Sequence, residues 1–522
     1  MTMLRIYVVF LFLISITACG QHQSKTLVFG RGGDSVGLDP ALETDGESFK
    51  VCDNIYETLV TFRPENTEVI PGLAESWVVS ADRKTYTFDL RKGVTFHDGT
   101  VFNSEDVVFS LARQFKTDHP YHNVEGAYQY WNSMSMSDIV KDVRKIDDYT
   151  VAIDLKRPNA TFLSNLAMNF CAIVGPEAVE RYGADYPRNP VGTGPFRFVQ
   201  WIKDDRVILE RNAEYWGMKP KIERLIFKSI PENMARLIAL RQGEIDGMDN
   251  LVPDFIADIE AQSDLKLLSQ AGMNVGYLAM NMDRPPFDNP GVRRAINHAI
   301  NKKSLVDNLY QGLALPAVNP IPPTIWSYHE GVEGYDYDPE RARALLKEAG
   351  FPNGFQTNLW AMPVTRPYMP QPLKIAQAIQ ADLKAVGVLA EIVRFEWGTY
   401  LDKVSRGQHD MALLGWTGDN GDPDNFLYVL LDKSATAHPA NNIAFYRSDD
   451  LHEILIQAQN EVAADIRTEL YRQAQVIVNR DAPWVPLVHA AQTAAFTKRV
   501  SGFRLHPTGS KWFHNVKIEA NP

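Results

Sequence analysis

The sequence predicts an α/β fold, and one stretch in the second half of the 522-residue chain carries most of that prediction. Residues 356–362, 389–395 and the apolar run that starts at Met411 are typical of strands. Between them, apolar residues recur at helical spacing over 373–386, and residues 397–404 suit a second, shorter helix. Crossover connections in such units are right-handed, so we expect these three strands to lie parallel in one sheet.

The third of these strands leads into a glycine-rich acidic segment. Residues 411–414 are uniformly apolar, as in a strand buried on both faces, and GWTGDNGDPDNF (415–426) then has the composition of a loop. The loop carries Trp416 and the carboxylates Asp419, Asp422 and Asp424. Because ligands of open α/β sheets bind beyond the carboxyl ends of the strands, the loop is a candidate site for a small, partly cationic molecule. The alternative is an acidic surface turn, and we expect Asp422 and Asp424 to brace the loop.

Two oppositely charged residues follow the ends of the predicted strands. Arg366 lies just past the first strand and Asp419 just past the third, so parallel strands would direct both toward one crevice. An arginine binds a carboxylate through paired N–H donors, and an aspartate accepts hydrogen bonds from an ammonium group. The pair therefore predicts a site for a zwitterion.

The first residues predict export. Arg5 precedes a short apolar stretch that ends in small residues, which is typical of a secretory signal over 1–18. The cysteine that follows resembles the lipidation site of bacterial lipoproteins, so Cys19 is expected to be lipidated, and 19–24 would be a tether. We expect no later transmembrane helix.

The net charge bears on the class of partner, and the cysteines bear on a possible disulfide. Loss of 1–18 would remove Arg5 and no acidic residue, so the net charge of −11 would become −12, which argues against nucleic acid as a partner. Of the three cysteines, Cys52 and Cys171 would remain. An oxidising compartment permits a disulfide between them, and buried free thiols are the alternative.

Motifs for catalysis are weak. Gly33-Asp34-Ser35-Val36-Gly37 matches the nucleophile elbow of hydrolases, but helix-breaking residues follow where that motif needs a helix. The chain has no HExxH motif and no clustered Cys/His spacing, and its twelve histidines are scattered. We therefore expect no catalytic residue, no metal site and no cofactor.

Longer motifs resemble a known family. PGLAESW, YTFDLRKGVTFHDG and VGTGPFRF occur in this order, followed by NPIPPTIWSY, YDPERARALLKEAGFPNGF and GWTGDNGDPDNF. These segments are similar to the family 5 solute-binding proteins of peptide and nickel ABC importers, and the last three resemble the dipeptide-binding branch. The resemblance covers essentially the whole chain after the signal. It implies a binding protein rather than an enzyme.

The resemblance also implies an architecture, the two-lobed periplasmic-binding-protein-like fold (type II, cluster C) with an inserted subdomain and a two-strand hinge. Transferred to this chain, the first lobe would comprise 25–63, 189–270 and 492–522. The insert would be 64–188, and the second lobe would be 271–491.

By the same resemblance, Asp419 would bind the ammonium group of a peptide and Arg366 its carboxylate, while Trp416, Thr417, Gly418 and Tyr368 would line the pocket. The expected partners are short peptides, above all dipeptides, and an ABC permease with its ATPase. The protein would be an extracytoplasmic monomer, tied to a bacterial membrane through Cys19. Alternatives are haem or glutathione as the ligand, a signalling lipoprotein without transport, and, from a different class, a secreted peptide hydrolase. A haem-binding histidine or methionine has no evident place near the crevice.

Overall fold

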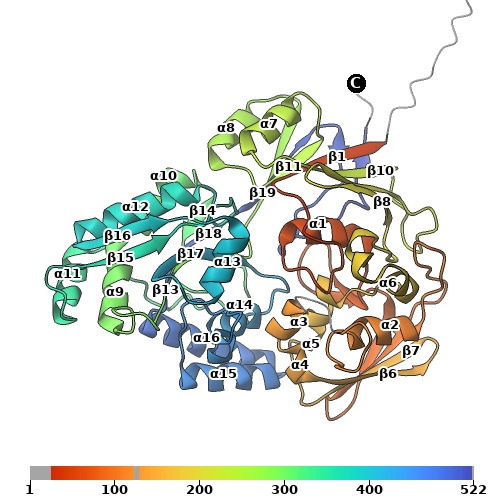
Figure 1. The fold of residues 1–522 in the computed structure, drawn as a ribbon, viewed down its shortest axis with the longest axis horizontal. Helices are drawn as coiled ribbons and strands as arrows, with labels where there is room; N and C mark the ends of the chain where they lie inside the picture. Colours follow the sequence, from red (N-terminus) through yellow and green to blue (C-terminus); the bar gives the residue numbers. More distant parts are fainter. Residues whose placement is uncertain (1–24, 123–127, 520–522) are drawn as a thin grey trace, which may run out of the picture.

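The computed structural model describes residues 25–122 and 128–519 (Figure 1). Residues 1–24, 123–127 and 520–522 lie outside the described part of the chain, and with them the predicted signal, the tether and Cys19.

A seven-stranded mixed sheet forms the core of the first lobe. Strand β1 pairs in parallel with β10 on one side and with β11 on the other, while β9 and β19 pair antiparallel to these neighbours. Phe29, Phe227 and Phe513 pack against one another in its buried apolar cluster. In spatial order the strands are β12 (Leu265–Gln270), β19 (Gln492–Thr497), β11 (Gly247–Asp249), β1 (Thr26–Arg31), β10 (Arg224–Ser229), β9 (Arg206–Arg211) and β8 (Phe196–Ile202).

A six-stranded sheet forms the core of the second lobe. In spatial order it contains β14 (Ala314–Pro316), β18 (Trp484–Ala490), β13 (Asn274–Met280), β17 (Met411–Thr417), β15 (Phe355–Trp360) and β16 (Val388–Val393). β15 pairs in parallel with both β16 and β17, which confirms the predicted parallel arrangement. Strand β17 ends three residues later than predicted, because β13 pairs antiparallel with it from Met280↔Met411 to Asn274↔Thr417. Gly415, Trp416 and Thr417 therefore belong to a strand rather than to the loop.

Between β1 and β8 the chain forms a separate antiparallel sheet, with the order β4 (Ala74–Val79), β5 (Thr85–Leu90), β7 (Thr150–Leu155) and β6 (Val140–Asp147). A hairpin around Asp147 joins β6 to β7, and Asn103 caps α2 (Ser104–Ala112) in a capping box with Asp106. We call 64–188 the inserted segment; its limits, like the other lobe boundaries, stay a prediction. Two short antiparallel pairs complete the strands: β2 (Val60–Phe62) with β3 (Val69–Pro71), and β20 (Val500–Ser501) with β21 (Lys517–Ile518).

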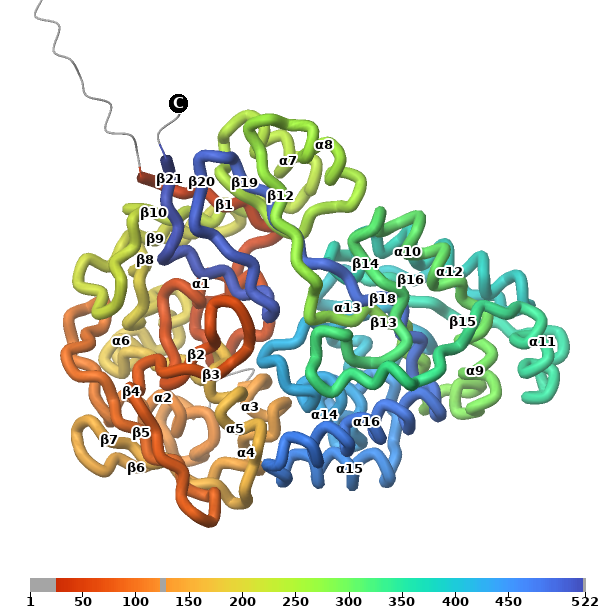
Figure 2. The backbone as a smooth tube through the Cα atoms, turned by 180° about the vertical axis from the view of Figure 1, so that it is seen from behind, coloured from red at the N-terminus to blue at the C-terminus, as the bar shows by residue number. Residues whose placement is uncertain are grey.

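Helices cover the sheets of both lobes (Figures 1 and 2). Besides α2, those before β13 are α1 (Gly46–Ile55), α3 (Gln129–Ser133), α4 (Met136–Ile139), α5 (Phe162–Leu166), α6 (Pro176–Tyr182), α7 (Asn233–Arg241) and α8 (Ile256–Glu260). Those after it are α9 (Pro290–Ala299), α10 (Lys302–Leu309), α11 (Pro339–Glu348), α12 (Pro372–Ala385), α13 (Trp397–Ser405), α14 (Asp424–Leu431), α15 (Asp449–Asn460) and α16 (Ala464–Asp481). In both views α14 and α15 lie beside α3, α4 and α5 of the inserted segment.

Two short connections join the lobes. The chain passes from β12 of the first sheet to β13 of the second through residues 271–273, and it returns from β18 to β19 through residue 491. The fully buried Asn274 ties these connections together: its Nδ2 donates to the Ala490 carbonyl at 2.8 Å, and its Oδ1 accepts from the Ala490 N–H at 2.9 Å. A Cβ on Gly272 would lie 2.1 Å from the Ala490 oxygen, so the close approach of the two connections requires glycine there.

The two cysteines of the described chain are free and fully buried, so the structure corrects the candidate disulfide between Cys52 and Cys171. Cys52 lies on α1 in the apolar cluster of the first lobe, whereas Cys171 belongs to a different cluster that includes residues of the inserted segment. Burial raises the pKa of both thiols well above their usual value, which is typical of inert packing cysteines.

Candidate functional site

A cavity of about 810 Å³ lies between the two lobes and the inserted segment. Its wall includes α1 and Asp249 from the first lobe, Tyr130 from the inserted segment, and Arg366 and Asp419 from the second lobe. The two charged residues predicted from the strand ends thus do line one cavity. A space of this size falls in the range of pockets that enclose small molecules.

Asp419 follows β17 and is held by polar groups from two directions. Its Oδ2 accepts a hydrogen bond from Asn425 Nδ2 at 3.3 Å, and its Oδ1 lies 3.5 Å from the hydroxyl of Tyr130, which donates to it. Burial raises the pKa of Asp419 to about 7, and the two hydrogen bonds offset part of this effect. The carboxylate has no basic side chain within ion-pair distance among the described residues, so a ligand ammonium is the charge partner that would favour its ionised form.

The loop after Asp419 is fixed by its other carboxylates, as expected for bracing residues. Asp422 accepts two hydrogen bonds of 2.9 Å from Arg467 on α16, and both groups are almost completely buried. Asp424 accepts from Gln459 Nε2 at 3.1 Å through each of its oxygens. Asp422 and Asp424 are therefore satisfied within the protein, which leaves Asp419 as the carboxylate of this loop that faces the cavity.

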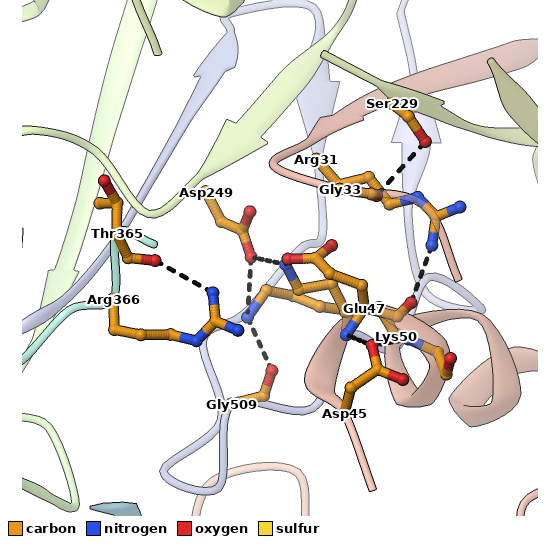
Figure 3. Close-up of polar contacts among 12 residues, drawn as sticks. Arg31, Gly33, Asp45, Glu47, Lys50, Ser229, Asp249, Thr365, Arg366 and Gly509 are labelled. Atoms are coloured by element: carbon orange, nitrogen blue, oxygen red, sulfur yellow. Dashed lines mark hydrogen bonds and ion pairs between the residues drawn. The ribbon is translucent and has the colours of Figure 1, made fainter. Parts of the chain in front are cut away.

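Arg366 lies beyond the end of β15 in a tight turn that pairs its backbone with that of Met369. Its Nη1 donates to the carbonyl of Thr365 at 3.0 Å, and its guanidinium lies 5.5 Å from the centre of the Trp397 ring. In Figure 3 the guanidinium points across the cavity toward the side of Asp249 and Gly509. No carboxylate of the described chain is within ion-pair distance of it. Most of its N–H donors are thus open to a ligand carboxylate.

Four further residues were predicted to line the pocket, and the structure places three of them there: Tyr368, Trp416 and Thr417. Gly418 is absent from the cavity wall. Its N–H donates to the Met273 carbonyl at 2.7 Å, and a Cβ at this position would lie 2.6 Å from the Phe426 ring. Gly418 is therefore a packing glycine.

Gly415 lines the cavity in place of Gly418, for a reason that only the structure shows. A Cβ on Gly415 would lie 2.3 Å from the ring of Tyr368, so the glycine leaves room for this tyrosine against β17. The hydroxyl of Tyr310 donates to the Tyr368 carbonyl at 2.9 Å and fixes its backbone.

Two residues of the site, Asn425 and Tyr130, were not predicted from the sequence. Asn425 Oδ1 accepts from the indole of Trp416 and from the N–H of Asp419, each at 2.9 Å. The only signal for it was its place in the GDPDNF segment, next to the loop. Tyr130 is 289 residues away from Asp419 in the chain, and no local pattern connects the two.

The opposite wall of the cavity, in the first lobe, carries a buried ionic network (Figure 3). Lys50 Nζ lies 2.9 Å from both Glu47 and Asp249, and Lys511 Nζ lies 3.7 Å from Asp249. Lys511 also donates to the Gly509 carbonyl at 2.7 Å. Asp249 stands at the carboxyl end of β11, so this lobe also presents its charged groups at the carboxyl edge of its sheet.

The chain is similar to known proteins over nearly its whole length. Residues 68–438 match the family described as bacterial extracellular solute-binding proteins, family 5 Middle. The chain belongs to this family. It is 41% identical to the dipeptide-binding protein of Escherichia coli K12 over 97% of each chain, and 39% identical to heme-binding protein A of Haemophilus influenzae over 96% of this chain and 94% of that one.

Solved structures of relatives share the fold of this chain, that of a two-lobed periplasmic binding protein. The periplasmic binding protein DppA from Helicobacter pylori, in complex with the peptide STSA, has a TM-score of 0.89 and 39% identity, with 95% of this chain and 98% of that chain covered. A dipeptide-binding protein from Pseudoalteromonas sp. SM9913, in complex with Met-Leu, has a TM-score of 0.90 and 31% identity, with coverages of 95% and 100%.

The described residues contain no group of three or more His, Cys, Asp or Glu side chains placed to hold a metal ion. None of their helices combines the length and apolar character that crossing a membrane requires.

Proposed function

We propose that this protein captures short peptides, most readily dipeptides, between its lobes and delivers them to the permease of an ABC importer. The observation that carries the proposal is that Arg366 and Asp419 both line one cavity, each without an oppositely charged partner in the described chain. The main chain of a free peptide supplies the two missing charges. The ligand is bound and released without chemical change.

The energetics favour a ligand that pairs both charges. Both side chains are partly buried and lack a charge partner, and the guanidinium and the carboxylate each gain one when a zwitterion binds. Because one extended residue spans about 3.5 Å, two fixed charges separated along the cavity select peptides by length. The side chains would occupy the remaining cavity volume, which lets many sequences bind.

The relatives support this reading. A dipeptide-binding protein and several di/tripeptide-binding proteins match nearly the whole chain, and one solved relative holds Met-Leu. Their family is one of solute-binding proteins, which supports a binding role over the secreted peptide hydrolase. We also propose that Cys19 carries a lipid anchor in the extracytoplasmic space and that the protein acts as a monomer.

Haem is the second candidate ligand, because heme-binding protein A is 39% identical to this chain. The sequence suggested no histidine or methionine near the crevice, but His438, His514 and Met168 all line the cavity. Haem propionates would satisfy Arg366, yet haem offers no ammonium group to Asp419. Glutathione has a free α-ammonium and satisfies both charges, so it belongs in the same test.

Isothermal calorimetry of the chain from Ser24 onward tests the proposal, with Ala-Ala, tri- and tetra-alanine, glutathione and haem as ligands. We expect the dipeptide to bind most tightly. Tight binding of haem with no heat from any peptide would contradict the proposal, and so would release of free alanine during incubation, which would indicate a hydrolase.

A further inference from the structure

The short helix α3 connects the inserted segment to the second lobe at three points. Tyr130 donates to Asp419 Oδ1, Asn425 Nδ2 lies 3.5 Å from the sulfur of Met134, and Asn441 Nδ2 donates to Ser133 Oγ at 2.8 Å. In Figures 1 and 2 this helix lies beside α14, whose first turn carries Asn425. The ammonium end of the cavity is thus closed by the inserted segment as well as by the second lobe.

The backbone on both sides of α3 is in a conformation that side chains disfavour. Tyr128, just before the helix, has φ 53° and ψ 46°, and Ser135, just after it, has φ 54° and ψ 22°. Neither residue is glycine, so each left-handed conformation costs free energy and persists only because the surroundings impose it. Such positions concentrate where a side chain must be held in place for function.

The side chain so placed is that of Tyr130. Its ring packs edge-on against Phe49 of α1, with centroids 5.6 Å apart, and at a tilt against Phe170 at 6.1 Å. Both contacts fix the ring while the hydroxyl reaches Asp419. Burial and the nearby Asp419 raise the pKa of Tyr130 well above its usual value, so the phenol stays protonated and acts as a donor.

We propose that Tyr130 is a ligand-positioning residue that closes the ammonium end of the cavity and restricts the protein to peptides with a free, unextended N-terminus. This inference rests on the proposed function. The phenol and Asn425 each occupy one oxygen of Asp419, which leaves the remaining lone pairs for one small ammonium group. An acetyl group or a further residue on the peptide nitrogen would have to displace the Tyr130 ring.

The test uses Tyr130→Phe and Tyr130→Ala in the full chain. Tyr130→Phe keeps the ring contacts and removes the donor. Tyr128→Phe is the matched control, since it also removes a tyrosine hydroxyl next to the same helix. The hydroxyl of Tyr128 donates to the Tyr121 carbonyl at 2.6 Å, and Tyr128 does not line the cavity. The readouts are the affinity for Ala-Ala from pH 5 to 8.5 and the ratio of the affinities for Ala-Ala and N-acetyl-Ala-Ala.

In Tyr130→Phe, we expect the affinity for Ala-Ala at pH 7 to fall about tenfold, as for losing a hydrogen bond to a charged group. Without that bond the pKa of Asp419 rises, so the pH at which the affinity declines should shift upward. Asp45, Arg366 and His438 line the same cavity and are unchanged in this variant. Tyr128→Phe should keep the wild-type pH profile, because its hydroxyl is remote from Asp419.

In Tyr130→Ala, the ratio of Ala-Ala to N-acetyl-Ala-Ala affinity should fall about tenfold or more, because the space of the ring admits the acetyl group. The inference is wrong if this ratio stays at the wild-type value, or if Tyr130→Phe leaves the pH profile in place. If the wild-type protein itself does not bind Ala-Ala, the proposed function fails instead, so the two failures are distinguishable.

Discussion

The side chain of Asn425 forms hydrogen bonds with both the backbone and the side chain of Asp419. The carboxamide oxygen accepts from the Asp419 N–H at 2.9 Å, and the carboxamide nitrogen donates to Asp419 Oδ2 at 3.3 Å. The same oxygen also accepts from the Trp416 indole. One side chain at the start of α14 therefore fixes the charged residue and an aromatic wall of the cavity together.

Replacing Asn425 by alanine should weaken peptide binding. The variant loses a hydrogen bond to a charged group, so the affinity for Ala-Ala should fall by about 1.5–3 kcal/mol in calorimetry. Asn358→Ala is the control, because Asn358 bonds to Asp410 in the same lobe and does not line the cavity. Equal affinity losses in the two variants would mean that Asn425 has no special role in the site.

Peptide affinity should depend on pH through Asp419. Its pKa is raised to about 7, chiefly by burial, and the ligand ammonium binds the ionised form. The affinity should therefore rise as pH increases toward about 7 and then level off, and below that value it should fall by up to about tenfold per pH unit. Calorimetry from pH 5 to 8 measures this slope. Asp419→Asn should bind weakly with a nearly flat profile; an equally steep slope in that variant would assign the titration to another group.

The connection between the lobes should depend on Asn274. In Asn274→Ala the N–H and the carbonyl of Ala490 both lose a partner in a buried position, and each unsatisfied group costs about 1–3 kcal/mol. We expect a clearly lower midpoint temperature of unfolding in differential scanning calorimetry. Asn308→Ala, on the exposed surface of α10, should change the midpoint little. Similar midpoints for the two variants would argue against this structural role.

Stability should be sensitive to loss of one partner of the ion pair between Asp422 and Arg467, which fixes the loop after Asp419. Arg467→Met leaves Asp422 as a buried carboxylate without its guanidinium, so the unfolding free energy should fall by about 3–5 kcal/mol. Adding Asp422→Asn should restore part of the loss, because the uncompensated charge is removed. Arg480→Met breaks an exposed pair with Asp481 and should cost about 1 kcal/mol or less. An equal cost for both arginines would show that the Asp422 pair is not effectively buried.

The order of elements over residues 355–417 could be predicted because the apolar periodicity there is strong and the turns carry glycine. The extent of β17 could not, since it depends on pairing with β13, which lies more than 130 residues earlier in the chain. Arg366 and Asp419 could be found because strand ends in parallel sheets converge on one edge. Which glycine lines the cavity could not be predicted, because it depends on which ring, Phe426 or Tyr368, packs against each glycine.

Tyr130 and the state of the cysteines depend on contacts between distant segments. Tyr130 reaches Asp419 only because the inserted segment folds against the second lobe, and its own neighbourhood in the sequence resembles ordinary core. Cys52 and Cys171 both lie in apolar stretches, a pattern that is the same for a disulfide and for two free thiols. Their burial in different clusters is a property of the packed structure.

The central claim is that Arg366 and Asp419 bind the two ends of one short peptide, and a thermodynamic cycle tests it most directly. Calorimetry would compare Ala-Ala with its C-terminal amide and with propionyl-alanine, which lacks the ammonium group, in the wild type, Arg366→Ala and Asp419→Ala. Each altered ligand should cost the wild type about 2–5 kcal/mol, and the amide should cost Arg366→Ala almost nothing further, just as propionyl-alanine should cost Asp419→Ala almost nothing. If each altered ligand costs the matching variant as much as it costs the wild type, these two residues do not bind the ends of the peptide.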